Sequence, residues 1–277
     1  MINSINKQAN ISILGCGWFG LELAKKLLAD GYQVKGSTTS ENKLISLKEA
    51  GIESHLVIFE PEASTFDDAF FQSDILIISV PPKRNSPSKT AYPEKIKAIA
   101  AAAKKNRVKQ IIFISSTGVY EDGNFIVNET VAPHPNSDSG KLMLAAEELL
   151  LAESAFSTTI IRFAGLIGPE RSLTKHLTGK SNVANGLAPI NLIHLKDCVG
   201  LTEIIIKKEA FGKVYHGVSP HHPTRADFYT KNCLARGLEA PQFIQELLTW
   251  KKIESVNVPE LEYQYQVSNW DDWLESL

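Results

Sequence analysis

A glycine-rich turn between a short apolar run and a helical pattern restricts the fold of this chain more than any other feature. The run 11–14 leads directly into Gly15, Gly17 and Gly20, and helical spacing follows over 19–29. In such a unit, the first glycine allows a tight turn, the second lets the backbone approach a pyrophosphate, and the third lets helix and strand pack closely. The helix N-terminus then favours an anion. The turn predicts a dinucleotide cofactor at Gly15, Gly17, Trp18, Phe19 and Gly20.

Short β-branched runs alternate with helical patterns over the first two-thirds of the chain. Runs such as 75–78 and 111–114 are apolar without a break, which is typical of strands buried on both faces. The alternation predicts an α/β fold of the Rossmann type, with a doubly wound parallel sheet. The predicted strands are 11–14, 33–36, 54–59, 74–80, 110–114, 158–162 and 214–218, and the predicted helices are 19–29, 41–50, 93–106 and 141–153.

The alternation loosens after residue 165, where glycine and proline interrupt the pattern as far as residue 189. Helical spacing at 227–237 and 241–250 is followed by an aromatic stretch that includes Trp270 and Trp273. We expect a dinucleotide-binding domain over 1–165, with 190–218 adding to its sheet. A smaller C-terminal α/β lobe, formed by 166–189 and 219–277, is expected on the substrate side.

Composition excludes several classes of protein. The 29 Lys and Arg residues against 31 Asp and Glu give a net charge of -2, which argues against a nucleic-acid partner. No apolar run approaches the ~18 residues that a membrane span needs. Residues 1–10 lack the apolar core of a secretory signal, so we expect a cytoplasmic location. Three widely spaced cysteines and the absence of paired ligand spacings predict neither disulfides nor a metal site.

The end of the second predicted strand bears on the choice of cofactor. NAD-binding folds usually place a carboxylate there for the ribose hydroxyls. This chain has Ser37, Thr38, Thr39 and Ser40 instead, with Lys43 one turn into the next helix. Hydroxyls and a cation suit a 2′-phosphate, so we expect NADP(H) to be favoured over NAD(H). Alternatively, the hydroxyls cap the following helix, and both roles are compatible.

Several motifs together resemble the extended short-chain dehydrogenase/reductase superfamily, in its NAD-dependent epimerase/dehydratase-like branch. Besides the glycine turn, they are Ile-Phe-Ile-Ser-Ser-Thr-Gly-Val-Tyr at 112–120, Ile-Arg-Phe-Ala-Gly-Leu-Ile-Gly-Pro at 161–169 and Asn-Leu-Ile-His-Leu-Lys-Asp at 191–197. Two segments also resemble a narrower group, the atypical YeeZ-like bacterial proteins. They are Gly-Cys-Gly-Trp-Phe-Gly at 15–20 and Val80-Pro81-Pro82 at the end of a predicted strand. The resemblance implies a cofactor contact at Val80 and Pro81.

The chain departs from the superfamily at its catalytic pair. Where the resemblance implies a Tyr-x3-Lys pair on a helix, this chain has Ser139 and Met143. The serine that orients the substrate oxygen matches Ser116, with Thr117 beside it; alternatively, these hydroxyls only cap a turn. Tyr120 is a candidate for proton transfer, although the end of this motif usually packs beside the sheet.

Two functions follow from these observations. The first is an NAD(P)-binding oxidoreductase-like enzyme that acts on a small polar substrate, with sugar- and nucleotide-linked compounds as candidates. The second is a non-catalytic dinucleotide sensor or interaction protein on the same fold. Basic residues at Lys83, Arg84 and Arg171 suit an anionic substrate, or are simply solvated. The resemblance also implies a homodimer, through helices in 96–103 and 141–151.

Overall fold

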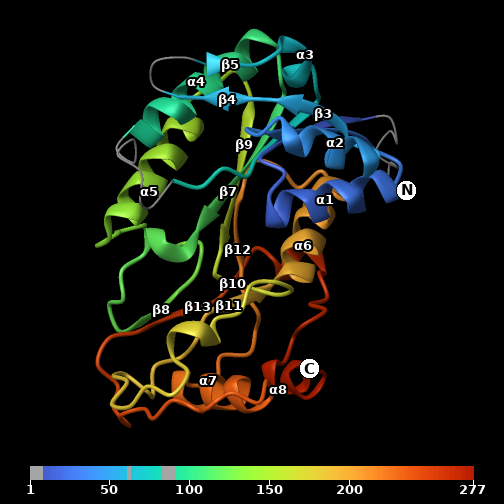
Figure 1. The fold of residues 1–277 in the computed structure, drawn as a ribbon. Coiled ribbons are helices and arrows are strands. Elements are labelled where there is room, and N and C mark those ends of the chain that lie inside the picture. The colour runs from blue at the N-terminus through green and yellow to red at the C-terminus, as the bar shows by residue number, and fades with distance from the viewer. Residues whose placement is uncertain (1–8, 61–63, 83–90) are drawn as a thin grey trace.

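Seven parallel strands form the central sheet, in the spatial order β12-β9-β7-β6-β1-β2-β3 (Figure 1). The computed structural model describes residues 9–60, 64–82 and 91–277. From β1 the chain moves outward to β2 and β3, and then returns to the other side of β1 to add β6. Such a reversal creates a crevice at the carboxyl ends of the strands, where ligands bind. The strands are β1 (Asn10–Leu14), β2 (Gln33–Thr38), β3 (Glu53–Leu56), β6 (Ile75–Ile78), β7 (Gln110–Ser116), β9 (Ser157–Phe163) and β12 (Val214–Gly217).

Helices cover both faces of this sheet (Figure 1). Helices α1 and α6 pack together on one face, and α4 and α5 pack together on the other. Because both faces are covered, the central strands carry apolar side chains in both directions. The helices around the sheet are α1 (Trp18–Ala29), α2 (Asn42–Glu49), α3 (Asp68–Phe71), α4 (Tyr92–Lys105), α5 (Asp138–Leu151) and α6 (Leu195–Lys207).

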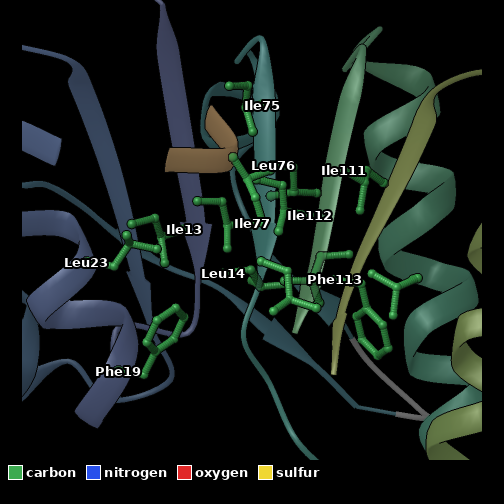
Figure 2. Close-up of a cluster of buried hydrophobic side chains, with 14 of the residues drawn as sticks. Ile13, Leu14, Phe19, Leu23, Ile75, Leu76, Ile77, Ile111, Ile112 and Phe113 are labelled. Atoms are coloured by element: carbon green, nitrogen blue, oxygen red, sulfur yellow. The ribbon is translucent and has the colours of Figure 1, made fainter. Parts of the chain in front are cut away.

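The core lies between the central strands and these helices (Figure 2). The register places Ile13 of β1 beside Ile77 of β6, and Ile77 beside Ile112 of β7. All three side chains are fully buried, and Leu23 of α1 lies beside Ile13 (Figure 2). Burying one such side chain contributes roughly 1.5–3 kcal/mol, so this layer holds the strand ends in fixed positions.

A smaller lobe, with its own apolar cluster, lies beyond the carboxyl ends of the strands (Figure 1). Two short parallel pairs join segments that are distant in the sequence: β10 (Gly165–Ile167) with β11 (Leu192–His194), and β8 (Phe125–Val127) with β13 (Lys251–Ile253). Helices α7 (Arg225–Leu234) and α8 (Trp270–Glu275) pack together around Phe228 and Trp270. Beside the main sheet, β4 (Ile58–Phe59) and β5 (Ser64–Thr65) form a short antiparallel pair.

The predicted α/β class with a doubly wound parallel sheet is confirmed, but one helix prediction is wrong. Residues 241–250 are irregular, and they run alongside 183–187 through backbone hydrogen bonds. The Val183 N–H donates to the Gln242 carbonyl, and the Ile244 N–H donates to the Val183 carbonyl. Leu247 and Leu248 are half exposed, so the apolar spacing there marks no buried face. Helix α8, in contrast, lies inside the stretch that the sequence suggested only as aromatic.

Candidate functional site

The glycine turn at the carboxyl end of β1 has a different requirement at each glycine. Gly15 has φ +100°, and a Cβ there would lie 2.8 Å from the Ser79 carbonyl oxygen. A Cβ at Gly20 would lie 2.3 Å from the Gly15 carbonyl oxygen, so that glycine allows α1 to approach the turn. Gly17 is the N-cap of α1, and a Cβ there would meet nothing within 4 Å. The helix N-terminus therefore opens onto free space, as an anion site requires.

Ser37 supports this turn from beneath. Its hydroxyl accepts a hydrogen bond from the Gly15 N–H at 2.9 Å, and its carbonyl accepts one from the Cys16 N–H at 2.9 Å. The Ser37 side chain is buried under the glycine turn, and its contact with a ribose phosphate stays a prediction. Burial also raises the pKa of the neighbouring Cys16 thiol to about 12, so the thiol is protonated at neutral pH.

The remaining residues predicted for ribose selectivity lie at the rim of β2. The Thr38 hydroxyl accepts a hydrogen bond from the Ser40 N–H at 3.1 Å, so it helps to shape the turn into α2. Thr39 and Lys43 are exposed. In this segment, Thr38 therefore fits the local turn role, and the exposed Thr39 and Lys43 fit a ligand role.

A cavity of about 480 Å³ lies at the carboxyl ends of β1, β6, β7 and β9. This volume falls within the range of small-molecule sites. Its wall also includes the start of α5 and a segment of the lobe. The lining residues are Gly15, Gly17, Trp18, Phe19, Ser79, Pro81, Pro82, Ile114, Ser115, Ser116, Thr117, Gly118, Ser139, Gly140, Met143, Phe163, Ala164, Gly165, Leu166 and Arg171.

The cavity brings the glycine turn and the hydroxyls at the end of β7 to one space. Ser116 and Thr117 line it together with Pro81. The Ser116 hydroxyl accepts a hydrogen bond from the Gly118 N–H at 3.1 Å, which caps a short 3-10 turn. This contact leaves the Ser116 hydroxyl proton available as a donor. Capping and substrate orientation are thus compatible roles for the same side chain.

The two residues at the positions where the resemblance implies a catalytic pair also line the cavity. Ser139 is half-buried, and its hydroxyl lies 3.5 Å from that of Ser137. Met143 is buried, with its sulfur 4.0 Å from the Tyr92 hydroxyl. Tyr92, which the sequence analysis missed, donates to the Val80 carbonyl at 2.8 Å. Burial raises the pKa of Tyr92 well above its usual range, so this hydroxyl is protonated at neutral pH.

Tyr120 lies outside the lining of this cavity, in a buried polar network. Its hydroxyl accepts a hydrogen bond from Arg162 and lies 3.0 Å from His216 Nε2. Arg162 forms an ion pair with Glu147 at 2.6 Å, and Glu147 also accepts a hydrogen bond from Ser115. Burial raises the pKa of Tyr120 to about 12. The Tyr120 hydroxyl is thus bonded to Arg162 and His216, as a structural role requires, and its proton-transfer role stays a prediction.

Arg171 is the one ionisable side chain among the described residues that line the cavity. Its guanidinium lies over the Trp18 ring, 5.1 Å from the ring centroid. Lys83 and Arg84, the other basic residues suggested for this edge, lie outside the described residues. Within the described parts of the chain, no group of three or more potential metal ligands is found, and no helix is long and apolar enough to cross a membrane.

A parallel doubly wound sheet with a glycine turn at its switch point defines a dinucleotide-binding protein of the Rossmann class. The NAD(P)H-binding family model matches residues 15–189. The chain is 34% identical to Protein YeeZ of Escherichia coli K12 over 262 residues, which cover 92% of this chain and 95% of that one. It therefore belongs to the NAD(P)H-binding family that this model describes, and to the group of proteins related to YeeZ.

Solved structures show the same fold at low sequence identity. UDP-glucuronic acid 4-epimerase from Bacillus cereus, in complex with NAD, has a TM-score of 0.78 at 19% identity, covering 96% of this chain and 94% of that one. The human epimerase family protein SDR39U1, with NADPH, has a TM-score of 0.71 at 15% identity, covering 96% and 98%. These similarities extend over the sheet and the lobe together.

Proposed function

We propose that this protein is an NADP(H)-dependent oxidoreductase acting on a small polar substrate between the sheet and the lobe. The observation that carries the proposal is the single cavity lined by both the glycine turn and the hydroxyls of Ser116 and Thr117. The cofactor's phosphates would meet the N-terminus of α1, with Gly15, Gly17, Trp18 and Phe19 around them. The nicotinamide, when bound, supplies the hydride chemistry.

Within this proposal, Ser116 and Thr117 hold the substrate oxygen, and Val80 and Pro81 lie beside the cofactor. Ser116 keeps a proton to donate in a hydrogen bond, and Thr117 is buried at the cavity wall. Met143 makes the adjoining wall apolar where the family's lysine would be charged. A sugar- or nucleotide-linked substrate fits this mixture of hydroxyl and apolar surface, and relatives of this fold include proteins solved with UDP-sugars.

The preference for NADP(H) rests on the rim of β2. Thr39 and Lys43 are exposed there, and the human relative was solved with NADPH. Glu41, also exposed, is the neighbouring carboxylate that an NAD-binding site would use. The choice between the two cofactors thus depends on whether Lys43 or Glu41 faces the ribose.

Substitution of these two residues separates the cofactors. We expect Lys43→Gln to raise the Kd of NADPH about tenfold, because about 1.4 kcal/mol of phosphate interaction is lost, while the Kd of NADH stays unchanged. Glu41→Gln is the matched control and should not weaken either cofactor. Binding is measured by fluorescence titration. Tighter binding of NADH than NADPH to the unaltered protein, or a loss of NADH binding in Glu41→Gln, would contradict the preference.

A non-catalytic sensor is the second candidate, and the replacement of the Tyr–Lys pair by Ser139 and Met143 favours it. Single-turnover oxidation of bound NADPH with panels of sugar-nucleotide and small carbonyl compounds distinguishes the two. Oxidation that Ser116→Ala slows by at least tenfold supports the enzyme. Tight NADPH binding without oxidation by any compound supports the sensor.

We further propose that the protein works in the cytoplasm as a homodimer joined through α4 and α5. These helices pack against each other on one face of the sheet, and Leu151 at the end of α5 is half exposed. The mass in solution, measured by light scattering, tests the dimer. A monomeric mass at micromolar concentration would contradict it.

A further inference from the structure

A four-residue turn of the lobe packs onto the first residue of α1. Gly168 and Arg171 exchange backbone hydrogen bonds, at 3.4 and 3.1 Å, which close the turn. The Trp18 indole N–H donates to the Pro169 carbonyl at 2.7 Å. A Cβ at Gly168 would lie 3.2 Å from Trp18 Cζ2, so the turn lies directly against the indole. The glycine turn and the lobe are thereby joined at the edge of the cavity.

Arg171 is held by this turn but has no anionic partner among the residues that the structure describes. Its guanidinium lies over the Trp18 ring, and the described residues give it neither an ion pair nor a side-chain hydrogen bond. Contact with an aromatic ring occupies the face of a guanidinium and leaves its N–H donors available at the edge. Glu170, in the same turn, is exposed and forms no ion pair with Arg171. A positioned and unpaired cation therefore faces the cavity.

We infer that Arg171 binds a phosphate or diphosphate group at the N-terminus of α1. Trp18 follows the N-cap Gly17 directly, and Gly17, Trp18 and the guanidinium over the Trp18 ring line the same cavity. Guanidinium and phosphate form paired hydrogen bonds in one plane. The position favours the diphosphate of the cofactor as the source of this anion; a phosphate on the substrate is the other source. The inference rests on the proposed cofactor site.

The role of the turn follows from this assignment. A diphosphate held by α1 on one side and by Arg171 on the other would connect the sheet domain to the lobe. Cofactor binding would then fix the lobe segment that also supplies Gly165 and Leu166 to the cavity wall. Arg171 would thus act as a binding residue that couples cofactor occupancy to the shape of the substrate side.

Binding measurements on Arg171→Gln test the assignment. We expect this variant to raise the Kd of NADPH about tenfold and to leave the Kd of adenosine 2′-phosphate, which has no diphosphate, unchanged. Arg171→Lys should recover only part of the affinity, because an ammonium cannot form the planar pair. Lys180→Gln is the matched control: it removes one exposed positive charge from the same part of the lobe, outside the cavity. Thermal melts check that each variant is folded.

A second measurement identifies the source of the anion. Inorganic pyrophosphate is titrated into the protein with and without saturating NADPH. Arg171→Gln could keep the NADPH affinity of the unaltered protein and yet, once saturated with NADPH, fail to bind pyrophosphate. This result would assign Arg171 to a substrate phosphate. Unchanged Kd values for NADPH and pyrophosphate in Arg171→Gln would overturn the inference. If the unaltered protein binds no NADPH, the proposed function fails, and pyrophosphate alone then tests Arg171.

Discussion

Gly17 and Gly20 belong to one motif, yet their substitution should have different consequences. At Gly17 the φ of -87° suits any residue, and a Cβ meets open space. We expect Gly17→Val to remain folded and to raise the Kd of NADPH at least a hundredfold, because the side chain fills the space in which a phosphate would lie. Titration of NADPH, with a urea melt on the same sample, measures both properties.

Gly20→Val is the contrasting control. Its Cβ would lie 2.3 Å from the Gly15 carbonyl oxygen, so we expect a loss of folding stability as well as of binding. Unchanged NADPH affinity in Gly17→Val would show that the phosphates bind elsewhere.

Individual residues also show where sequence reasoning stops. The G-x-G-x-x-G spacing indicated the tight turn and the close approach of α1, because the contact between Gly20 and Gly15 is local in the sequence. It could not indicate that Ser37 is used beneath the turn, since the partner of its hydroxyl lies 22 residues away. The same holds for Tyr120, whose hydroxyl pairs with His216, 96 residues further along the chain. Side chains with distant partners become visible only in the folded protein.

Among the elements, β7, β9 and α5 are joined by one buried ion pair. Arg162 of β9 and Glu147 of α5 are almost fully buried, and Ser115 of β7 donates to the same carboxylate. We expect Glu147→Gln to lower the free energy of unfolding by about 3–5 kcal/mol, because the variant leaves the Arg162 charge buried without a counterion. Urea denaturation measures this difference.

Glu153, just beyond α5, provides the matched control. It pairs with Lys104 in an exposed position, at 3.1 Å. Exposed pairs contribute about 0–1 kcal/mol, so Glu153→Gln should have little effect. Equal unfolding free energies for the two variants would show that the buried pair does not hold these elements together.

Elements in the sheet were predictable and those in the lobe were less so, for one physical reason. Strands covered on both faces carry unbroken apolar runs, as in β6, and these runs are visible without knowledge of their partners. The segment 241–250 has apolar residues at helical spacing, but its backbone forms hydrogen bonds with 183–187. The side chains of Leu247 and Leu248 are left half exposed. Apolar spacing predicts a helix only where one face becomes buried.

For the whole molecule, two buried histidines predict how stability depends on pH. His194 Nδ1 accepts from the Lys196 N–H at 3.2 Å, and His216 Nδ1 lies 2.9 Å from the Glu254 carbonyl oxygen. Burial lowers the pKa of both imidazoles in the folded protein. As pH falls, the unfolded chain therefore binds protons at these histidines before the folded protein does. Their contribution to the free energy of unfolding is complete above about pH 6.5 and is lost as pH falls toward the folded pKa values.

The size of this loss is bounded. Each histidine can contribute up to about 1.4 kcal/mol per pH unit below about pH 6.5. Unfolding free energies from urea melts at pH 7.5, 6.5 and 5.5 measure it, and His216→Gln should reduce the slope. A flat profile over this range would contradict the neutral, buried state of these side chains.

The long-range pairing of β8 with β13 has a consequence for the order in which the protein is built. The Trp250 N–H donates to Asn124 Oδ1 across 126 positions of the chain. Synthesis at roughly 5–20 residues per second separates these two segments by about 6–25 s. During that interval the glycine turn and β7 are already synthesised. The strand β13, which pairs with β8 after Ser116 and Thr117, is not. A nascent chain therefore has the parts of its glycine turn well before the lobe beside the cavity can assemble.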